Sequence, residues 1–234
     1  MLRRREREGD DIELDEAVSA VLAQRGGHAD ELRVHTRSMH AAESIAVLLL
    51  LDCSASTARP HGLDAERGTQ LLTQQRVARL FAVAMAATGG LLAIQGFDSD
   101  GREGVNHWRV KDFGEPWSEA TAARLAGLQS GLSTRLGAAL RHATRALTAQ
   151  PASRRLIVVM SDGDPHDIDI HDPHYLIEDA RHAVQSAWLV GVETMGMLLD
   201  AEGAEASRRI FGVGKSALLG DAGSVAFVLS RLLG

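Results

Sequence analysis

The stretch that decides the fold is IAVLLLLDCSAS, residues 45–56. Its first seven residues, Ile45 to Leu51, are all apolar, as is typical of a strand that is buried on both faces of a sheet. A polar segment follows at once, from Asp52 to Ser56. Because ligands of open α/β folds bind at the carboxyl ends of the strands, this polar segment is the first candidate for a functional site.

Apolar runs and helical periodicity alternate along the rest of the chain. Residues 105–113 alternate between polar and apolar side chains and predict a half-exposed edge strand. This order predicts an α/β, Rossmann-like fold, in which helices cover both faces of a mostly parallel sheet with one antiparallel edge strand. The other predicted strands are 91–97, 156–160, 194–199 and 217–219, and the predicted helices contain 77–85, 136–147, 176–187 and 225–233.

The chain divides at about residue 44. Residues 1–43 form a charged N-terminal extension, in which Asp15 to Gln24 predict one short helix that Gly26 and Gly27 end. Residues 44–234 are expected to form the main domain. The 234-residue chain has a normal share of hydrophobic residues, 45%, so this domain can bury an ordinary core.

Composition excludes several classes of protein. Lys and Arg number 25 against 31 Asp and Glu, which gives a net charge of −6 and argues against nucleic-acid binding. The longest aliphatic run, residues 45–51, is far shorter than the roughly 20 residues of a membrane-spanning helix. No apolar stretch follows the arginines at the N-terminus, so no secretory signal is expected. One cysteine, Cys53, cannot form an internal disulfide. We therefore expect a cytoplasmic protein with no membrane span.

Oxygen-bearing side chains follow two predicted strands and precede one predicted helix. Asp52, Ser54 and Ser56 end the first strand, Thr134 precedes the helix that contains residues 136–147, and Asp162 follows the strand 156–160. Hydroxyl and carboxylate oxygens are ligands for Mg²⁺, Mn²⁺ or Ca²⁺ rather than zinc. Each residue alone has an ordinary explanation as a helix cap or turn residue. Only their joint arrangement predicts a metal site.

This joint arrangement resembles a von Willebrand factor A domain with a complete metal-ion-dependent adhesion site. The resemblance runs from about residue 44 to the C-terminus. It implies that Ser54 and Ser56 bind Mg²⁺ directly, and that Thr134 does so directly or through water. Asp52 and Asp162 would complete the site, and a Glu or Asp of a partner protein would occupy the last position.

A narrower resemblance is to the C-terminal A domain of the CbbO/NorD family. It implies an adaptor that recognises a target enzyme for a ring-shaped MoxR-type AAA+ ATPase of the CbbQ/NorQ kind. The main expectation is activation of rubisco, and the alternative is activation of nitric oxide reductase. Family members carry a long region before this domain, whereas about 44 residues precede it here. The similar stretches are LLLLDCSAST (48–57), VKDFGEPW (110–117), TRLGAALRHAT (134–144), SDGDPHDID (161–169) and YLIEDARHAV (175–184).

Enzymatic alternatives have weaker support. A metal-dependent phosphohydrolase would use Asp52 as its nucleophile, but the second acid expected two residues later is replaced by Ser54. Gly212 to Ser216 has the ending of a phosphate-binding loop, yet Arg209 occupies the position of the required first glycine, and the segment follows a helix. We therefore expect a binding protein and not an enzyme.

Three other features have two interpretations each. The His- and Asp-rich segment 164–174 could hold zinc, although a polar loop beside the magnesium site is the favoured interpretation, with Asp167 and Asp169 adjusting its electrostatics. Trp108 and Trp117 could form an exposed interaction patch or pack within the fold. Cys53 is expected to be a buried, inert thiol.

Overall fold

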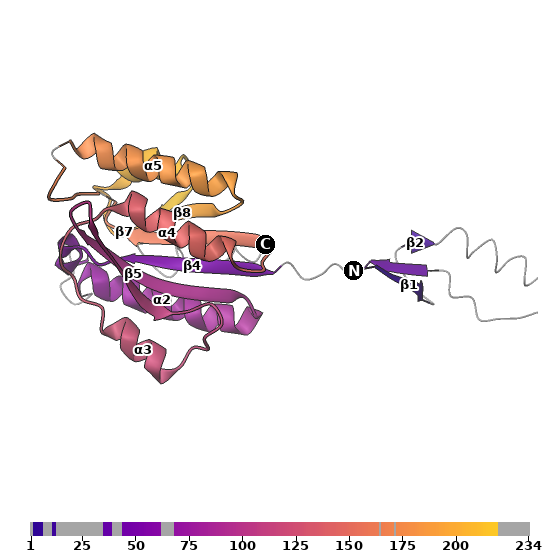
Figure 1. The fold of residues 1–234 in the computed structure, drawn as a ribbon. Helices are drawn as coiled ribbons and strands as arrows, with labels where there is room; N and C mark the ends of the chain where they lie inside the picture. The colour runs from indigo at the N-terminus through magenta and orange to yellow at the C-terminus, as the bar shows by residue number, and fades with distance from the viewer. Residues whose placement is uncertain are drawn as a thin grey trace, which may run out of the picture. The chain divides into compact units, whose positions relative to one another are not determined.

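A computed structural model describes residues 2–6, 11–12, 35–38, 44–61, 68–163, 165–170 and 172–219. The chain forms two compact units, Met1–Glu43 and Ser44–Gly234 (Figure 1). The first unit contains a small antiparallel sheet in the order β1-β3-β2, which the sequence did not predict. The helix expected between Asp15 and Gln24 lies outside the described residues. The strands are β1 (Leu2–Glu6), β2 (Asp11–Ile12) and β3 (His35–Ser38).

The second unit is built on a six-stranded sheet in the order β6-β5-β4-β7-β8-β9. Neighbouring strands are parallel except β5 and β6, which are antiparallel. The α/β prediction is therefore confirmed, including its antiparallel edge strand. The strands are β4 (Ile45–Asp52), β5 (Leu91–Asp100), β6 (Gly104–Lys111), β7 (Arg154–Ser161), β8 (Glu193–Leu198) and β9 (Ser216–Leu218).

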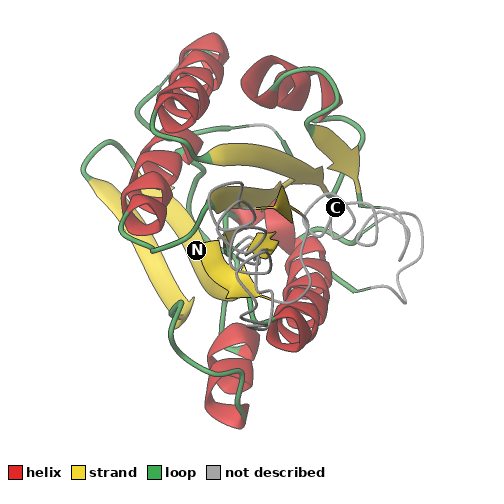
Figure 2. Ribbon diagram, turned by 90° about the vertical axis from the view of Figure 1, so that its right-hand side faces the viewer, coloured by secondary structure: helices red, strands yellow, loops and turns green. Residues whose placement is uncertain are grey.

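Helices cover both faces of this sheet (Figures 1 and 2). The apolar side chains of α2 and α3 pack on one face, and those of α4, α5 and α6 pack on the other. Helix α3 was not predicted, and the segment 225–233, expected to be helical, lies outside the described residues. The helices are α2 (Gln70–Thr88), α3 (Glu119–Ala126), α4 (Leu136–Thr148), α5 (Pro173–Leu189) and α6 (Ala204–Phe211), with a 3₁₀ turn, η1 (Ala55–Ala58).

Strand β4 explains why the sheet is the centre of the fold. Its side chains alternate between the two cores: Val47, Leu49 and Leu51 face α2 and α3, whereas Leu48 and Leu50 face α4 and α5. All five side chains are fully buried. Burying a side chain of this size contributes about 1.5–3 kcal/mol, so the continuous apolar run strongly fixes β4 between two helical layers.

Helix α4 packs closely on α5 because residue 137 is a glycine and has no Cβ atom. A Cβ atom at Gly137 would lie 2.0 Å from Oδ2 of Asp179. The Asp179 carboxylate instead accepts two hydrogen bonds from Arg141 of α4, at 2.9 and 3.0 Å. This bidentate pair fixes the two helices beside the loop that carries Thr134.

The chain path identifies the sheet edge at which ligands bind. From β4 the chain passes to β5 on one side, and it later returns to β7 on the other side of β4. The carboxyl ends of β4 and β7 therefore flank a topological switch point, the usual ligand position in such folds. Among the described residues, no helix has the length and apolar character needed to cross a membrane.

Candidate metal site

The end of β4 places the first three predicted residues together. The Asp52 carboxylate is fully buried, and its Oδ1 accepts a hydrogen bond from the backbone N–H of Ser54 at 2.8 Å. The chain then turns into η1, which brings the Ser54 and Ser56 hydroxyl oxygens to 3.0 Å from each other. The turn therefore presents two neighbouring hydroxyls, and the hydrogen bond from the Ser54 N–H to Asp52 stabilises the turn.

The end of β7 brings the next two polar groups to Asp52. The Ser161 hydroxyl donates to Oδ2 of Asp52 at 2.7 Å and accepts from the N–H of Gly163 at 3.1 Å. Asp162 lies between them and is half-buried. Ser161 was not among the predicted site residues, although its position at the end of a buried strand is the signal that identified Asp162.

The loop before α4 supplies the fifth predicted residue. The Thr134 hydroxyl lies 3.3 and 3.5 Å from the two carboxylate oxygens of Asp52. Two backbone bonds hold this loop: the Thr134 N–H donates to the carbonyl of His166 at 2.7 Å, and the Ala55 N–H donates to the carbonyl of Leu132 at 3.0 Å. Segments far apart in the sequence thus converge on one carboxylate.

The electrostatics of Asp52 are unusual for a carboxylate. Burial and, to a smaller extent, the nearby Asp162 carboxylate raise the pKa of Asp52 to about 6. Hydrogen bonds from Ser54 and Ser161 oppose this increase but do not cancel it. A negative charge at Asp52 is therefore only partly compensated by its neutral donors.

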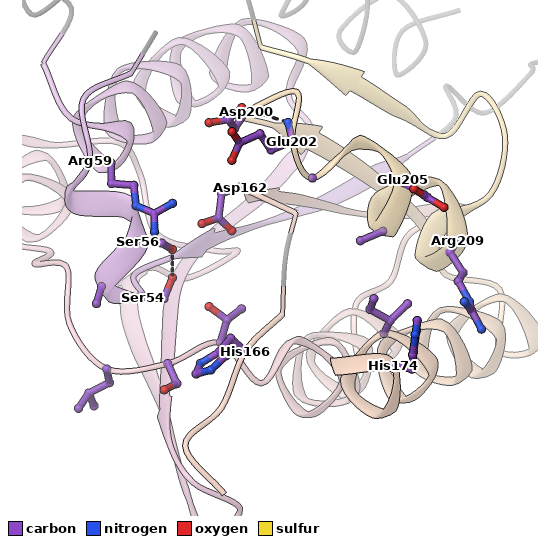
Figure 3. Close-up of a pocket in the computed structure, with 17 residues that line it drawn as sticks. Ser54, Ser56, Arg59, Asp162, His166, His174, Asp200, Glu202, Glu205 and Arg209 are labelled. Carbon is purple, nitrogen blue, oxygen red and sulfur yellow. Dashed lines mark hydrogen bonds between the residues drawn. The ribbon is translucent and has the colours of Figure 1, made fainter. Parts of the chain in front are cut away.

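These residues lie at the base of a pocket of about 680 Å³ (Figure 3). Ser54, Ser56, Thr134 and Asp162 line it, and Asp52 lies behind them. In Figure 3 the Ser54 and Ser56 hydroxyls and the Asp162 carboxylate lie on facing sides of the base. The structure therefore brings all five predicted residues together and exposes four of them to the pocket.

The walls of the pocket contain charged residues that the sequence did not single out. Asp200, Glu202 and Glu205 come from the end of β8 and the start of α6, and Arg59 follows η1 (Figure 3). Asp200 comes just after a strand predicted from the sequence, so the same rule that selected Asp162 could have found it. The wall also contains the nitrogen-bearing side chains of Arg59, His166, His174 and Arg209.

Two glycines join the loops that follow β7 and β8. Gly163 has a positive φ of 93°, which favours glycine, and a Cβ there would lie 2.8 Å from the carbonyl oxygen of Gly203. A Cβ at Gly203 would lie 1.9 Å from the carbonyl oxygen of Asp162. The loop that carries Asp162 and the loop that carries Glu202 thus contact through bare backbone.

The His- and Asp-rich segment contributes an internal ion pair. Arg135 donates from Nε to Asp167 at 2.8 Å, and its guanidinium also contacts Asp169. Burial alone would raise the pKa of Asp167, but hydrogen bonds from Ser99, Ile168, Arg135 and Gly101 outweigh burial and lower this pKa. Through Arg135, Asp167 and Asp169 therefore hold their loop against the residue that follows Thr134.

The zinc interpretation of this segment gains no support. Within the described ranges, no three His, Cys, Asp or Glu side chains are grouped so that they could hold a metal ion.

Cys53 is buried, and burial raises the pKa of its thiol to about 12, as expected for an inert cysteine.

The donor set at the base of the pocket fits a hard divalent cation. It consists of hydroxyl and carboxylate oxygens, without sulfur, and the two serine hydroxyls already lie near each other.

Comparison with known proteins identifies sequence relatives. No protein-family model matches the chain. It is 34% identical to NorD of Brucella suis over 92% of this chain and 33% of that protein. It is 28% identical to NorD of Stutzerimonas stutzeri over 96% of this chain and 36% of that protein. An uncharacterized protein of Pseudomonas aeruginosa is 33% identical over 95% of this chain and 36% of its own. The chain spans about a third of the length of these curated relatives.

Solved structures identify the fold. The PilB minor pilin of Streptococcus sanguinis matches with a TM-score of 0.65 and 14% identity, over 88% of this chain and 65% of that chain. The vWF domain of the type V pili tip protein Mfa5 of Porphyromonas gingivalis matches with a TM-score of 0.60 and 12% identity, over 82% of this chain and 95% of that chain. The second unit of this chain therefore has the fold of a von Willebrand factor domain, and in sequence the chain is NorD-like.

Proposed function

We propose that this chain is a protein-recognition domain that depends on a divalent cation, Mg²⁺ or else Mn²⁺ or Ca²⁺. Ser54, Ser56, Thr134 and Asp162 would hold the cation, and Asp52 would support them from behind. The observation that carries the proposal is the convergence of these oxygen donors at the switch point of the sheet, at the base of an open pocket.

The bound cation would supply an open coordination position for an anionic oxygen, such as a Glu or Asp carboxylate of the partner. The residues of this chain then have separate tasks. The neutral hydroxyls of Ser54 and Ser56 leave most of the positive charge available to the partner. Asp52 orients the Ser54 backbone and the Thr134 hydroxyl, as a supporting carboxylate does in metal sites.

We further propose that the chain acts with a MoxR-type AAA+ ATPase on a target enzyme. The sequence similarity favours nitric oxide reductase as the target over rubisco, since two of the relatives described above are named NorD. The similarity covers only a third of those proteins. In this proposal the chain recognises the target enzyme, and the ATPase supplies the force.

Burial of Asp52 favours recognition over phosphate-ester hydrolysis. A nucleophilic carboxylate must reach the substrate phosphorus, whereas Asp52 is fully buried behind the residues that line the pocket. We therefore propose that the chain is not an enzyme.

Calorimetric titration of Mg²⁺ and Mn²⁺ into the full chain tests the metal site. We expect saturable binding that is lost in the double variant Ser54→Ala, Ser56→Ala. Ser186→Ala, at a half-buried serine of α5 that does not line the pocket, is the matched control and should bind as the wild type does. An unchanged affinity in the double variant would refute the site.

The partner is tested by capture on the immobilised chain, with purified nitric oxide reductase, rubisco and a MoxR-type ATPase as candidates. We expect reductase retention that EDTA abolishes and added Mg²⁺ restores. Retention of rubisco alone would refute the preferred target, and retention that is indifferent to EDTA would refute the metal-dependent mechanism. Turnover of p-nitrophenyl phosphate that requires metal and Asp52 would support the hydrolase instead.

A further inference from the structure

A second pocket, of about 590 Å³, lies between β6 and the segment 127–131. It shares no lining residue with the pocket of the metal site. Its wall includes Trp108, one of the tryptophans that the sequence left open between packing and an interaction patch, and Asp98 from β5. The proposed metal site therefore gives this pocket no role.

Asp98 is a buried carboxylate whose described donors are neutral. The residue is 5% exposed, and its oxygens accept from Nδ2 of Asn106 at 2.7 Å and from Nε1 of Trp108 at 3.4 Å. A carboxylate can accept about four hydrogen bonds, so Asp98 retains acceptor capacity on the side of the pocket. A buried negative charge without a positive partner is costly, which favours a cation beside it.

The two arginines that line the same pocket are engaged elsewhere. Arg124 donates from Nε to the carbonyl of Val110 at 2.7 Å and pairs with Glu115. Arg109 pairs with Asp112 at 3.4 Å. Among the described residues, no ion pair reaches Asp98.

Trp108 adds a second feature that favours a cation. Its side chain is 48% exposed although its indole N–H is directed to Asp98. This bond orients the ring next to the carboxylate and leaves much of its surface open. A carboxylate beside an indole ring is a combination that attracts cations, through charge-assisted hydrogen bonds and through the ring face.

We propose that this pocket binds one arginine side chain of a partner protein. The planar guanidinium can donate two parallel hydrogen bonds to Asp98 and stack on the Trp108 ring. An ammonium group would make only point contacts with the same groups and keeps its hydration more strongly, so the pocket favours guanidinium over ammonium. The proposal does not depend on the metal site, and its test uses no metal.

The probe is Nα-acetyl-arginine N-methylamide, titrated into the ¹⁵N-labelled full chain. The chain has three tryptophans, so the three indole N–H signals can be followed separately, and Trp108→Phe assigns the relevant one. We expect a saturable shift of the Trp108 signal in the millimolar range. The corresponding citrulline derivative, which has the same shape without the charge, should cause no saturable shift.

Two carboxamide variants then locate the charge that matters. Asp98→Asn should weaken probe binding by roughly tenfold or more. Asp100→Asn, on the same strand but outside the pocket, should leave the affinity within about twofold of the wild type. Equal weakening by both variants would mean a general charge effect and would overturn the proposal.

Further outcomes keep the proposal falsifiable. Binding of citrulline equal to that of arginine, tighter binding of the lysine derivative, or no saturable shift up to the solubility limit would each overturn it. If Asp98→Asn does not fold, Trp108→Leu replaces it, and the backbone N–H signal of Gly131 reports binding. This variant keeps Asp98 and should also bind the probe several-fold more weakly, whereas wild-type affinity would refute the contribution of the ring.

Discussion

Two buried carboxylates at the same edge of the sheet have opposite surroundings. Asp52 is 0% exposed and receives hydrogen bonds from the Ser54 backbone and from the hydroxyls of Ser161 and Thr134, which are all neutral donors. Asp167 is 1% exposed and receives an Arg135 guanidinium in addition to its neutral donors. The pKa of Asp52 is raised to about 6, whereas the pKa of Asp167 is lowered.

The contrast separates a carboxylate that is paired with a cationic side chain from one whose described hydrogen-bond donors are all neutral. Asp167 obtains its counter-charge from within the chain and fastens a loop. Asp52 lies next to a second carboxylate, Asp162, which raises its pKa. In the proposed function a bound divalent cation balances these negative charges. The following measurements can break or sharpen the contrast.

Removal of the internal cation should have the largest effect. Arg135→Met leaves Asp167 buried without its charged partner, which costs about 3–5 kcal/mol of unfolding free energy. Urea denaturation at neutral pH measures this loss. A loss below about 1 kcal/mol would mean that the ion pair does not hold the loop, and the contrast with Asp52 would fail.

Addition of the external cation should stabilise the chain next most strongly. Mg²⁺ at 100 times its dissociation constant should raise the unfolding free energy by about 2.7 kcal/mol, because it binds the folded state. Thermal unfolding with and without EDTA measures the gain. Ser54→Ala with Ser56→Ala should abolish it, and Arg135→Met should retain it if the chain still folds. A gain that survives loss of both serines would place the cation elsewhere.

Neutralising Asp52 should stabilise the metal-free chain. The pKa of Asp52 is 3.8 in the unfolded chain and about 6 in the folded one, so the folded state binds more protons between these values. Its stability therefore falls as the pH rises through this window. Asp52→Asn should remove that fall and add about 3 kcal/mol above it, as urea titrations in EDTA across this range can show.

The sign of this pH dependence distinguishes the two carboxylates. For Asp167 the lowered pKa gives stability that is present above 3.8 and is lost as the pH falls through the folded value. Asp167→Asn should therefore destabilise the chain at neutral pH. A stabilising effect of Asp167→Asn, or a destabilising effect of Asp52→Asn, would reverse the comparison.

An exposed ion pair should show the smallest effect. Arg109 and Asp112 lie 3.4 Å apart, with side chains 73% and 55% exposed. Because water and salt screen such a pair, Asp112→Asn should change the unfolding free energy by no more than about 0.5 kcal/mol. The same urea titration measures it beside Arg135→Met. Equal losses in the two variants would show that burial does not control the strength of these pairs.

The sequence was most informative where one local pattern had one outcome. The apolar run 45–51 has the length of a strand and is short for a core helix, so the polar residues after it were expected at the sheet edge. Helix α3 was not predicted because it is short and has few large apolar residues in a helical pattern. Hydrogen bonds between the side chains and backbones of Ser118 and Thr121 cap its start. The strands of residues 1–43 escaped because this segment is charged and carries no clear alternation.

Partnerships between distant segments could not be predicted. Asp167 was expected to adjust the site, but its pairing with Arg135 depends on how the loop folds back onto α4. Asp200, Glu202 and Glu205 line the pocket because β8 pairs with β7, and this pairing was not known from the sequence. Asp98 and Trp108 lie ten residues apart, and only the antiparallel β5–β6 hairpin brings them together.

The glycine contact between the loops after β7 and β8 bears on how this pocket could be diversified in the laboratory. Positions 163 and 203 have to stay glycine in any library, since a methyl group at 203 would collide with the backbone that carries Asp162. Glu202 and Glu205, on the other hand, line the pocket with exposed side chains. Selection for new partners should therefore enrich changes at these two positions and return glycine at the other two.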